Sequence, residues 1–145
     1  MSKLKLNITM VVLLLVSIFA IAGCGGGSDG APRIMGLSPD GVVKTVFDNV
    51  KANRMNDAKE YLAPNTVGDK TVIQEMRNSN LLFVKTVAQK GDYAVVVATL
   101  QPENSSISVK PVGLEKINGE WYVLDVNNIY NNVKYSILQR LLANI

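Results

Sequence analysis

Apolar residues recur with helical spacing in the segment that follows residue 37. In "SPDGVVKTVFDNVKANR", Val42, Val46, Phe47 and Val50 share one helix face, because positions three and four apart lie on the same side. The Ser-Pro pair at 38–39 fits an N-cap followed by the first helical position. The same kind of spacing predicts two shorter helices, within residues 54–64 and 68–80.

After residue 80 the spacing changes to that of β-strands, and four strands are expected, over residues 81–90, 93–101, 107–117 and 120–126. Gly91-Asp92 and Asn118-Gly119 separate two pairs of strands and are typical of tight hairpin turns. In "YAVVVATL" both alternating sets are apolar, which predicts a central strand covered on both faces. Pro111 and Gly113 indicate an edge position or a bulge. The pattern predicts an α+β fold, with N-terminal helices packed on a curved four-stranded antiparallel sheet.

The tail "NNIYNNVKYSILQRLLANI", residues 127–145, predicts a C-terminal amphipathic helix. Its apolar positions cover about 200° of the helix circumference at ~100° per residue, more than one sheet face would bury. Three interpretations remain open. The helix packs entirely on its own domain, or part of it forms a surface for a second copy or another protein. Contact with lipid headgroups is the least favoured, because only Lys134 and Arg140 are basic. The residues expected on that surface are Tyr130, Tyr135, Leu138 and Leu142.

The N-terminus has the layout of a secretory signal. Lys3 and Lys5 precede an apolar run over residues 8–21, which is shorter than the roughly 20 residues that span a bilayer. The run ends in the small residues Ala22 and Gly23, as expected before a cleavage site. We therefore expect residues 1–23 to be a signal peptide.

The tetrad Ile21-Ala22-Gly23-Cys24 resembles the lipobox of bacterial lipoproteins, with isoleucine in place of the commoner leucine. The resemblance implies diacylglycerol on the Cys24 thiol, cleavage before this residue, and a lipid anchor on the outer face of the cytoplasmic membrane or on the outer membrane. The alternatives are an ordinary signal peptide with an incidental cysteine, or an uncleaved anchor. The glycine-rich residues 24–37 are expected to form a flexible, lipidated tether, followed by a domain over 38–126 and the helix over 127–145.

A family resemblance rests on the order of the predicted elements. The opening valine-rich helix, the turn "ANRMNDA", a second helix ending in "YLAP" and the closing "LEKINGEWYVLDV" resemble the nuclear transport factor 2-like fold. They are most similar to an uncharacterised group of such domains in bacterial lipoproteins. The resemblance covers residues 38–126 and implies a cone formed by the sheet and the helices. It includes no catalytic signature, so it bears on fold more than on function.

Charge and residue types exclude several classes of function. Lys3 and Lys5 contribute to the net charge of +3 and would leave with the signal, and no block of like charge follows, so no nucleic-acid partner is expected. The chain has no histidine and one cysteine. With Cys24 acylated, the common ligands of zinc and copper are missing, and we expect no metal, no cofactor and no catalytic residue.

Pocket candidates come from the resemblance, because some enzymes of this fold use a carboxylate and tyrosines inside the cone. The residues expected near such a pocket are Phe47, Tyr61, Tyr93, Glu115, Trp121 and Tyr122. Hairpin pairing places Glu115 opposite Tyr122, either as an acid–tyrosine pair in a pocket or, the favoured interpretation, as an exposed pair at the edge. Trp121 is expected in the core, with the pocket wall as the alternative.

Three functions follow. The leading hypothesis is a membrane-anchored, non-catalytic lipoprotein whose domain binds a partner or a ligand. The alternative is a small apolar ligand held in the cone pocket. An isomerase-like enzyme of the same fold is third, because the chain lacks the usual acid–base residues.

Overall fold

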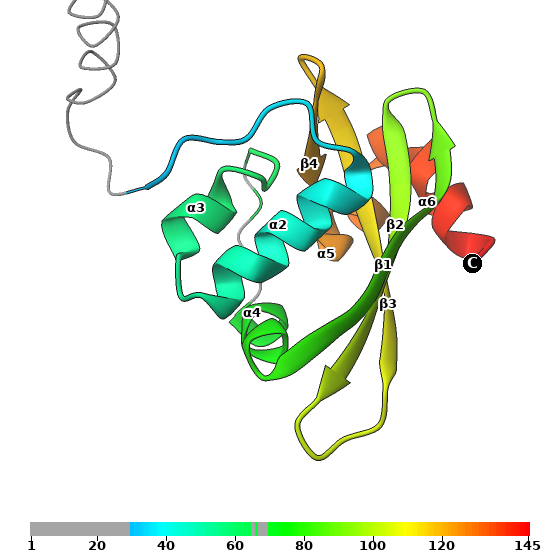
Figure 1. The fold of residues 1–145 in the computed structure, drawn as a ribbon. Helices are drawn as coiled ribbons and strands as arrows, with labels where there is room; N and C mark the ends of the chain where they lie inside the picture. Colours follow the sequence, from blue (N-terminus) through cyan, green and yellow to red (C-terminus); the bar gives the residue numbers. More distant parts are fainter. Residues whose placement is uncertain (1–29, 65, 67–69) are drawn as a thin grey trace, which may run out of the picture.

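The computed structural model describes residues 30–64, 66 and 70–145 (Figure 1). The predicted signal peptide and Cys24 lie outside these residues. The described elements are α2 (Pro39–Lys51), α3 (Met55–Lys59), α4 (Lys70–Arg77), β1 (Ser79–Lys90), β2 (Tyr93–Pro102), β3 (Ser108–Ile117), β4 (Glu120–Val123), α5 (Val126–Asn131), the 3₁₀ turn η2 (Val133–Tyr135) and α6 (Ser136–Ala143).

The first helix begins where the sequence predicts. The Ser38 hydroxyl accepts a hydrogen bond from the Gly41 amide at 3.3 Å, which satisfies one of the unpaired donors at the helix start. Pro39 occupies the first turn, where its missing N–H is not needed. The predicted apolar face is buried, and Val42 and Val50 are at most 2% exposed. This face packs against the sheet and against α3 and α4.

The four strands form one antiparallel meander in the order β1-β2-β3-β4, as predicted. Asn118 and Gly119 both have positive φ, and Gly91 has a φ of +58°, as the two predicted hairpin turns require. Val95 and Val96 on β2 point to opposite faces and are both 0% exposed, which confirms the central strand.

The irregularities of the sheet lie in β1, where the register shifts twice, and not at Pro111. Strand β4 pairs with β3 only from Leu114 to Ile117. Pro111 therefore lies in a stretch of β3 that pairs with β2 alone, and the missing N–H of proline is tolerated on that open side.

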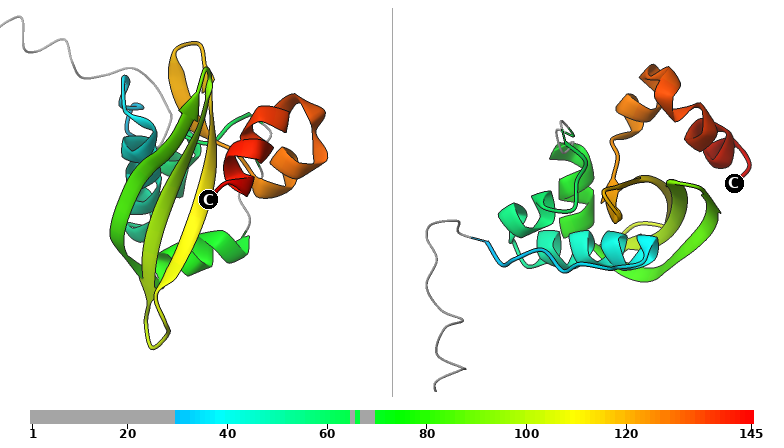
Figure 2. Two further views of the ribbon diagram at one scale, coloured as in Figure 1. Left: turned by 90° about the vertical axis from the view of Figure 1, so that its right-hand side faces the viewer. Right: turned by 90° about the horizontal axis from the view of Figure 1, so that it is seen from above.

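Helical segments lie on both faces of the sheet (Figure 2). Helix α2, with α3, contributes to a core of valines, Tyr61, Leu114 and Trp121 on one face. The C-terminal segment forms a second core on the other face around Val95, Ile129 and Leu138. Both cores consist of residues from 30–145, so a chain of residues 25–145 keeps every contact described here.

The C-terminal segment differs from the single helix predicted over residues 127–145. Asn132 has an extended backbone, with φ −130° and ψ 120°, and separates α5 from η2 and α6. Its side chain accepts a hydrogen bond from the Lys134 amide at 3.0 Å, an arrangement that competes with helix continuation. The break turns the segment so that Ile129 and Leu138, both 0% exposed, pack on the same sheet.

Candidate ligand-binding pocket

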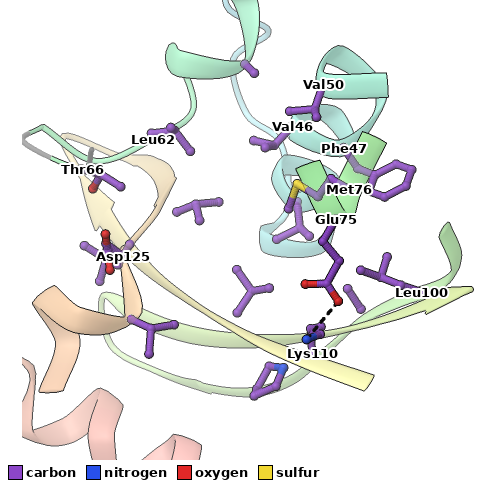
Figure 3. Close-up of a pocket in the computed structure, with 18 of the residues that line it drawn as sticks. Val46, Phe47, Val50, Leu62, Thr66, Glu75, Met76, Leu100, Lys110 and Asp125 are labelled. Atoms are coloured by element: carbon purple, nitrogen blue, oxygen red, sulfur yellow. Dashed lines mark ion pairs between the residues drawn. The ribbon is translucent and has the colours of Figure 1, made fainter. Parts of the chain in front are cut away.

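A cavity of about 400 Å³ lies between the helices and the inner face of the sheet (Figure 3). Helix α2 contributes Val43, Val46, Phe47 and Val50 to its wall. The other apolar lining residues come from α3, α4 and the strands, and include Met55, Met76, Leu81, Ala98, Leu100 and Val112. The volume lies within the range of about 300–1,000 Å³ that is usual for ligand pockets.

Short and branched side chains keep this space open. Ala58 on α3 and Ala98 on β2 have little side chain to fill the gap between helix and sheet. The valines of α2 are stiff at χ1 and do not extend far into it. The sheet is curved, as seen from above in Figure 2. Residues of β2 and β3, among them Ala98, Leu100 and Val112, line the cavity.

Polar groups of the lining include an ion pair that bridges the pocket. Lys110 Nζ on β3 lies 3.0 Å from Glu75 Oε1 on α4, and their side chains are 47% and 32% exposed. Asp125 also lines the pocket, and its Oδ1 accepts a hydrogen bond at 2.7 Å from the Asn127 amide at the start of α5. The hydroxyl of Thr66 is buried and has no hydrogen-bond partner among the described residues.

Of the six residues expected at the pocket, one lines the cavity and five lie elsewhere. Phe47 lines the cavity. Tyr61 and Trp121 are at most 5% exposed and belong to the core below α2, outside the cavity lining. Tyr93, Glu115 and Tyr122 form a cross-strand row, which includes the predicted Glu115–Tyr122 pairing. Tyr93 and Tyr122 pack against the second core, so this row does not contribute to the cavity wall.

Glu115 is buried, not exposed as the favoured interpretation had it, because the C-terminal segment covers it. It is 8% exposed, its Oε1 lies 2.6 Å from Lys134 Nζ, and its Oε2 accepts a hydrogen bond from the Tyr135 hydroxyl at 3.2 Å. The hydrogen bond to Glu115 raises the pKa of Lys134, and burial raises the pKa of Tyr135. This arrangement fastens η2 to β3, and nothing in it faces the cavity.

Of the four residues expected on a partner surface, two are buried, one is partly buried and one is exposed. Tyr135 and Leu138 are 6% and 0% exposed and belong to the second core, which corrects that expectation for both. Leu142 is partly buried against the same core. Tyr130 is 58% exposed, beside Val133 at 87% and Ile137 at 38%, so an apolar strip remains at the surface of the segment.

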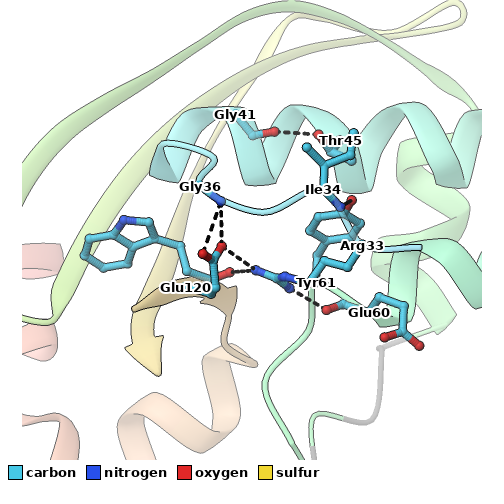
Figure 4. A network of polar contacts seen from close by, with 9 residues as sticks. Arg33, Ile34, Gly36, Gly41, Thr45, Glu60, Tyr61 and Glu120 are labelled. Carbon is cyan, nitrogen blue, oxygen red and sulfur yellow. Dashed lines mark hydrogen bonds and ion pairs between the residues drawn. The ribbon is translucent and has the colours of Figure 1, made fainter. Parts of the chain in front are cut away.

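Residues 30–37 are fastened to the domain, in contrast to the flexible tether predicted there (Figure 4). The guanidinium of Arg33 lies over the rings of Tyr61 and Tyr122, at 4.7 and 4.1 Å from their centroids. It donates to the carbonyl oxygens of Glu60 and, at 2.7 Å, Trp121. We call residues 30–37 the N-terminal arm.

The side chains of Tyr61 and Glu120 also bond to the backbone of the arm. The Ile34 amide donates to the Tyr61 hydroxyl at 2.9 Å. The Gly36 amide donates to the carboxylate of Glu120, which also lies 3.9 Å from the Arg33 guanidinium. No local pattern in the sequence indicates the role of Arg33, because its partners lie 27 and 88 residues away along the chain. Residues 30–37 therefore belong to the domain, which was expected to start at residue 38.

Comparison with known protein families and with curated proteins gives no match for this chain. Within residues 30–64, 66 and 70–145, no group of three or more histidine, cysteine or acidic side chains could hold a metal ion. No helix in this part of the chain has the length and apolar character needed to cross a membrane.

Proposed function

We propose that this protein is a membrane-anchored extracytoplasmic lipoprotein whose domain binds a small apolar ligand in the pocket below α2. The observation that carries the proposal is the apolar cavity of about 400 Å³. We further propose that the α+β domain belongs to the nuclear transport factor 2-like folds. The four-stranded meander with α2 on its inner face is consistent with that assignment.

The apolar walls of the cavity support a ligand on energetic grounds. The lining side chains Lys110 and Glu75 are 47% and 32% exposed, so the space opens to solvent there. Water in the open space would lie against apolar walls, and an apolar occupant would remove that unfavourable contact.

The proposed anchor would keep the start of the domain close to a membrane. Six peptide units separate Cys24 from Gly30, the first residue of the N-terminal arm, and an extended chain spans at most ~3.6 Å per residue. The domain would thus start within roughly 20 Å of the lipid. Changing Cys24 to Ala should leave the precursor uncleaved and abolish incorporation of radiolabelled fatty acid, and continued labelling would contradict the assignment.

A non-catalytic role is supported by the occupied carboxylates of the pocket. Glu75 is paired with Lys110, and Asp125 caps α5, so each already has a structural partner. Of the acid–tyrosine pair that an isomerase-like enzyme would need, Glu115 is buried and accepts a hydrogen bond from Tyr135 of the C-terminal segment, and neither Glu115 nor Tyr122 lines the cavity. The isomerase alternative therefore receives no support from the residues first considered for it.

Binding of a neutral fluorescent probe tests the pocket. N-phenyl-1-naphthylamine becomes fluorescent in apolar surroundings, and residues 25–145 should enhance its emission in a saturable way. Changing Ala98 to Phe would place a ring in the cavity and should remove the enhancement. The matched control is Ala88 to Phe, on the strand β1 and against the other core, which should leave probe binding intact. Equal loss in both variants would contradict the proposal.

A second candidate, a protein partner or a second copy on the C-terminal segment, rests on the exposed strip of Tyr130, Val133 and Ile137. If a second copy covers this strip, residues 25–145 should be dimeric by light scattering, and changing Val133 to Asp should yield monomers with unchanged probe binding. A monomeric wild-type chain would exclude self-association through this surface.

A further inference from the structure

An ion pair lies where the pocket opens at the edge of the sheet. Lys110 is on β3, and β4 pairs with β3 only over residues 114–117, so β4 leaves this edge uncovered at Lys110. Its position opposite Ala98, and two residues before Val112, places Lys110 on the face of the sheet that lines the cavity. The side chains of Lys110 and its partner Glu75 are 47% and 32% exposed. Each of the two therefore lines the cavity and also reaches solvent.

Other contacts already fasten α4, the helix of Glu75, to the rest of the domain. The Ser79 hydroxyl donates to the Glu75 carbonyl at 2.6 Å. Lys51 Nζ on α2 donates to the carbonyls of Arg77 and Ser79 at 3.0 and 2.6 Å. Ion pairs that are partly exposed, like Glu75–Lys110, add little to stability. The two charges are therefore available to a ligand at low cost to the fold.

A head group at this opening meets one carboxylate and one ammonium group. The third charged residue among the described lining residues, Asp125, lies at the opposite end of the pocket and accepts a hydrogen bond from the Asn127 amide (Figure 3). Apolar side chains line the wall between the two ends. A head with a single charge is attracted by one member of the Glu75–Lys110 pair and repelled by the other. A head with both charges is complementary to both members.

We propose that the ligand is a single-chain zwitterionic amphiphile, with its alkyl chain in the cavity and its head at the Glu75–Lys110 pair. This inference rests on the proposed function. The ammonium group of the head pairs with the Glu75 carboxylate, and its anionic group pairs with Lys110 Nζ. Neither side chain is then left without an opposite charge. At ~30 Å³ per water-sized unit, the cavity of about 400 Å³ has room for a chain of about ten carbon atoms.

Displacement of N-phenyl-1-naphthylamine from residues 25–145 by four ten-carbon compounds tests the head group. They are decylphosphocholine, decanoate, decyltrimethylammonium and 1-decanol, each used below the concentration at which it forms micelles or separates from water. We expect decylphosphocholine to bind about 3- to 10-fold more tightly than decanoate or decyltrimethylammonium, because it alone pairs with both side chains. The uncharged 1-decanol reports whether the alkyl chain enters the cavity.

Charge variants at the two positions test which side chains recognise the head. Glu75→Gln should strengthen binding of decanoate relative to decylphosphocholine, because it removes the charge that repels an anion. Lys110→Gln should do the same for decyltrimethylammonium. The double exchange of Glu75→Lys with Lys110→Glu keeps one charge of each sign at the opening and should retain the preference for decylphosphocholine.

The matched control is the exposed ion pair of Lys44 and Asp48 on α2, at 2.6 Å and outside the cavity lining. Lys44→Gln and Asp48→Asn should leave the relative affinities of the four compounds unchanged. Circular dichroism and retained displacement by 1-decanol show that a variant is folded and that its cavity is open.

The outcomes separate this inference from the function it rests on. Equal affinity for decylphosphocholine and the two singly charged compounds overturns the head-group proposal and leaves the apolar pocket standing. So does a preference for decylphosphocholine that persists unchanged in Glu75→Gln and Lys110→Gln. A probe that does not bind wild-type protein, when circular dichroism and a cooperative thermal transition show that protein to be folded, overturns the proposed function itself.

Discussion

A methyl group added at Gly113 should loosen the C-terminal segment from the sheet. A Cβ at this position would lie 2.6 Å from Ile129 Cδ1 and 3.0 Å from Leu138 Cδ2. Carbon atoms pack no closer than about 3.5 Å without repulsion, so Gly113 to Ala forces both side chains to shift. Both are 0% exposed and have little room to move.

Two opposing effects set the magnitude. Overpacking a core costs about 1–3 kcal/mol, whereas replacing glycine by alanine within a strand gains about 0.5–1 kcal/mol from the unfolded state. The net expectation is a loss of about 1–2 kcal/mol. For a domain of this size that lowers the melting temperature by about 5 °C.

Urea unfolding of a double-mutant cycle is the assay. Ile129 to Val removes the methyl group nearest the added Cβ and alone should cost about 0.5–1.5 kcal/mol. When Ile129 to Val is combined with Gly113 to Ala, the double variant should be as stable as Gly113 to Ala alone, or more stable. The interaction free energy between the two positions would then be about 1 kcal/mol. If Gly113 to Ala is stabilising and its effect adds to that of Ile129 to Val, the packing of α5 on β3 described here is wrong.

Three further predictions follow from single contacts. Phe47 to Ala should cost about 3 kcal/mol in urea unfolding, the low end for a buried ring, because Phe47 already borders a cavity. Arg33 to Ala should make the arm susceptible to limited proteolysis and cost about 1–3 kcal/mol, and Arg33 to Lys should not rescue it, since lysine lacks the planar fork. The Thr86 hydroxyl, at 2.8 Å, lowers the pKa of Asp40 below its ordinary 3.8. This contact therefore stabilises the fold above that pH and is lost as the pH falls through the lowered pKa, and NMR titration of Thr86 to Val should show the pKa raised.

Local features of the fold could be predicted from the sequence. These features are the Ser38 cap, the two hairpin turns and the buried face of α2. Each depends on residues within a few positions of one another, so the local sequence pattern is enough to predict it. The burial on both faces of β2 could also be predicted, because a central strand needs apolar residues in both alternating sets.

The features that the sequence did not reveal depend on contacts between distant residues. Arg33 looks like a tether residue until Tyr61 and Tyr122 are placed beside it. Glu115 looks like an exposed hairpin residue until Lys134 and Tyr135 cover it. The break at Asn132 was hidden by the continuing apolar spacing on both sides of it.

Of the six residues that the sequence suggested for a pocket, only Phe47 lines the cavity. Its other apolar walls are valines, alanines and methionines, which have the same pattern whether they fill a core or surround a space. The other five candidates do not line the pocket, and they are Tyr61, Tyr93, Glu115, Trp121 and Tyr122.

Methionine methyl NMR tests the central claim, an apolar ligand in the pocket below α2, most directly. In residues 25–145 labelled at the methionine ε-carbon, Met55 and Met76 line the cavity, whereas Met35 is 65% exposed on the arm and serves as an internal control. We expect 1-decanol to shift the Met55 and Met76 signals in a saturable manner, to give nuclear Overhauser contacts from its alkyl chain to both, and to leave Met35 unchanged. Contacts to Met35 alone, or no saturable shift at Met55 and Met76 with decanol or decyl methyl ether, would contradict it.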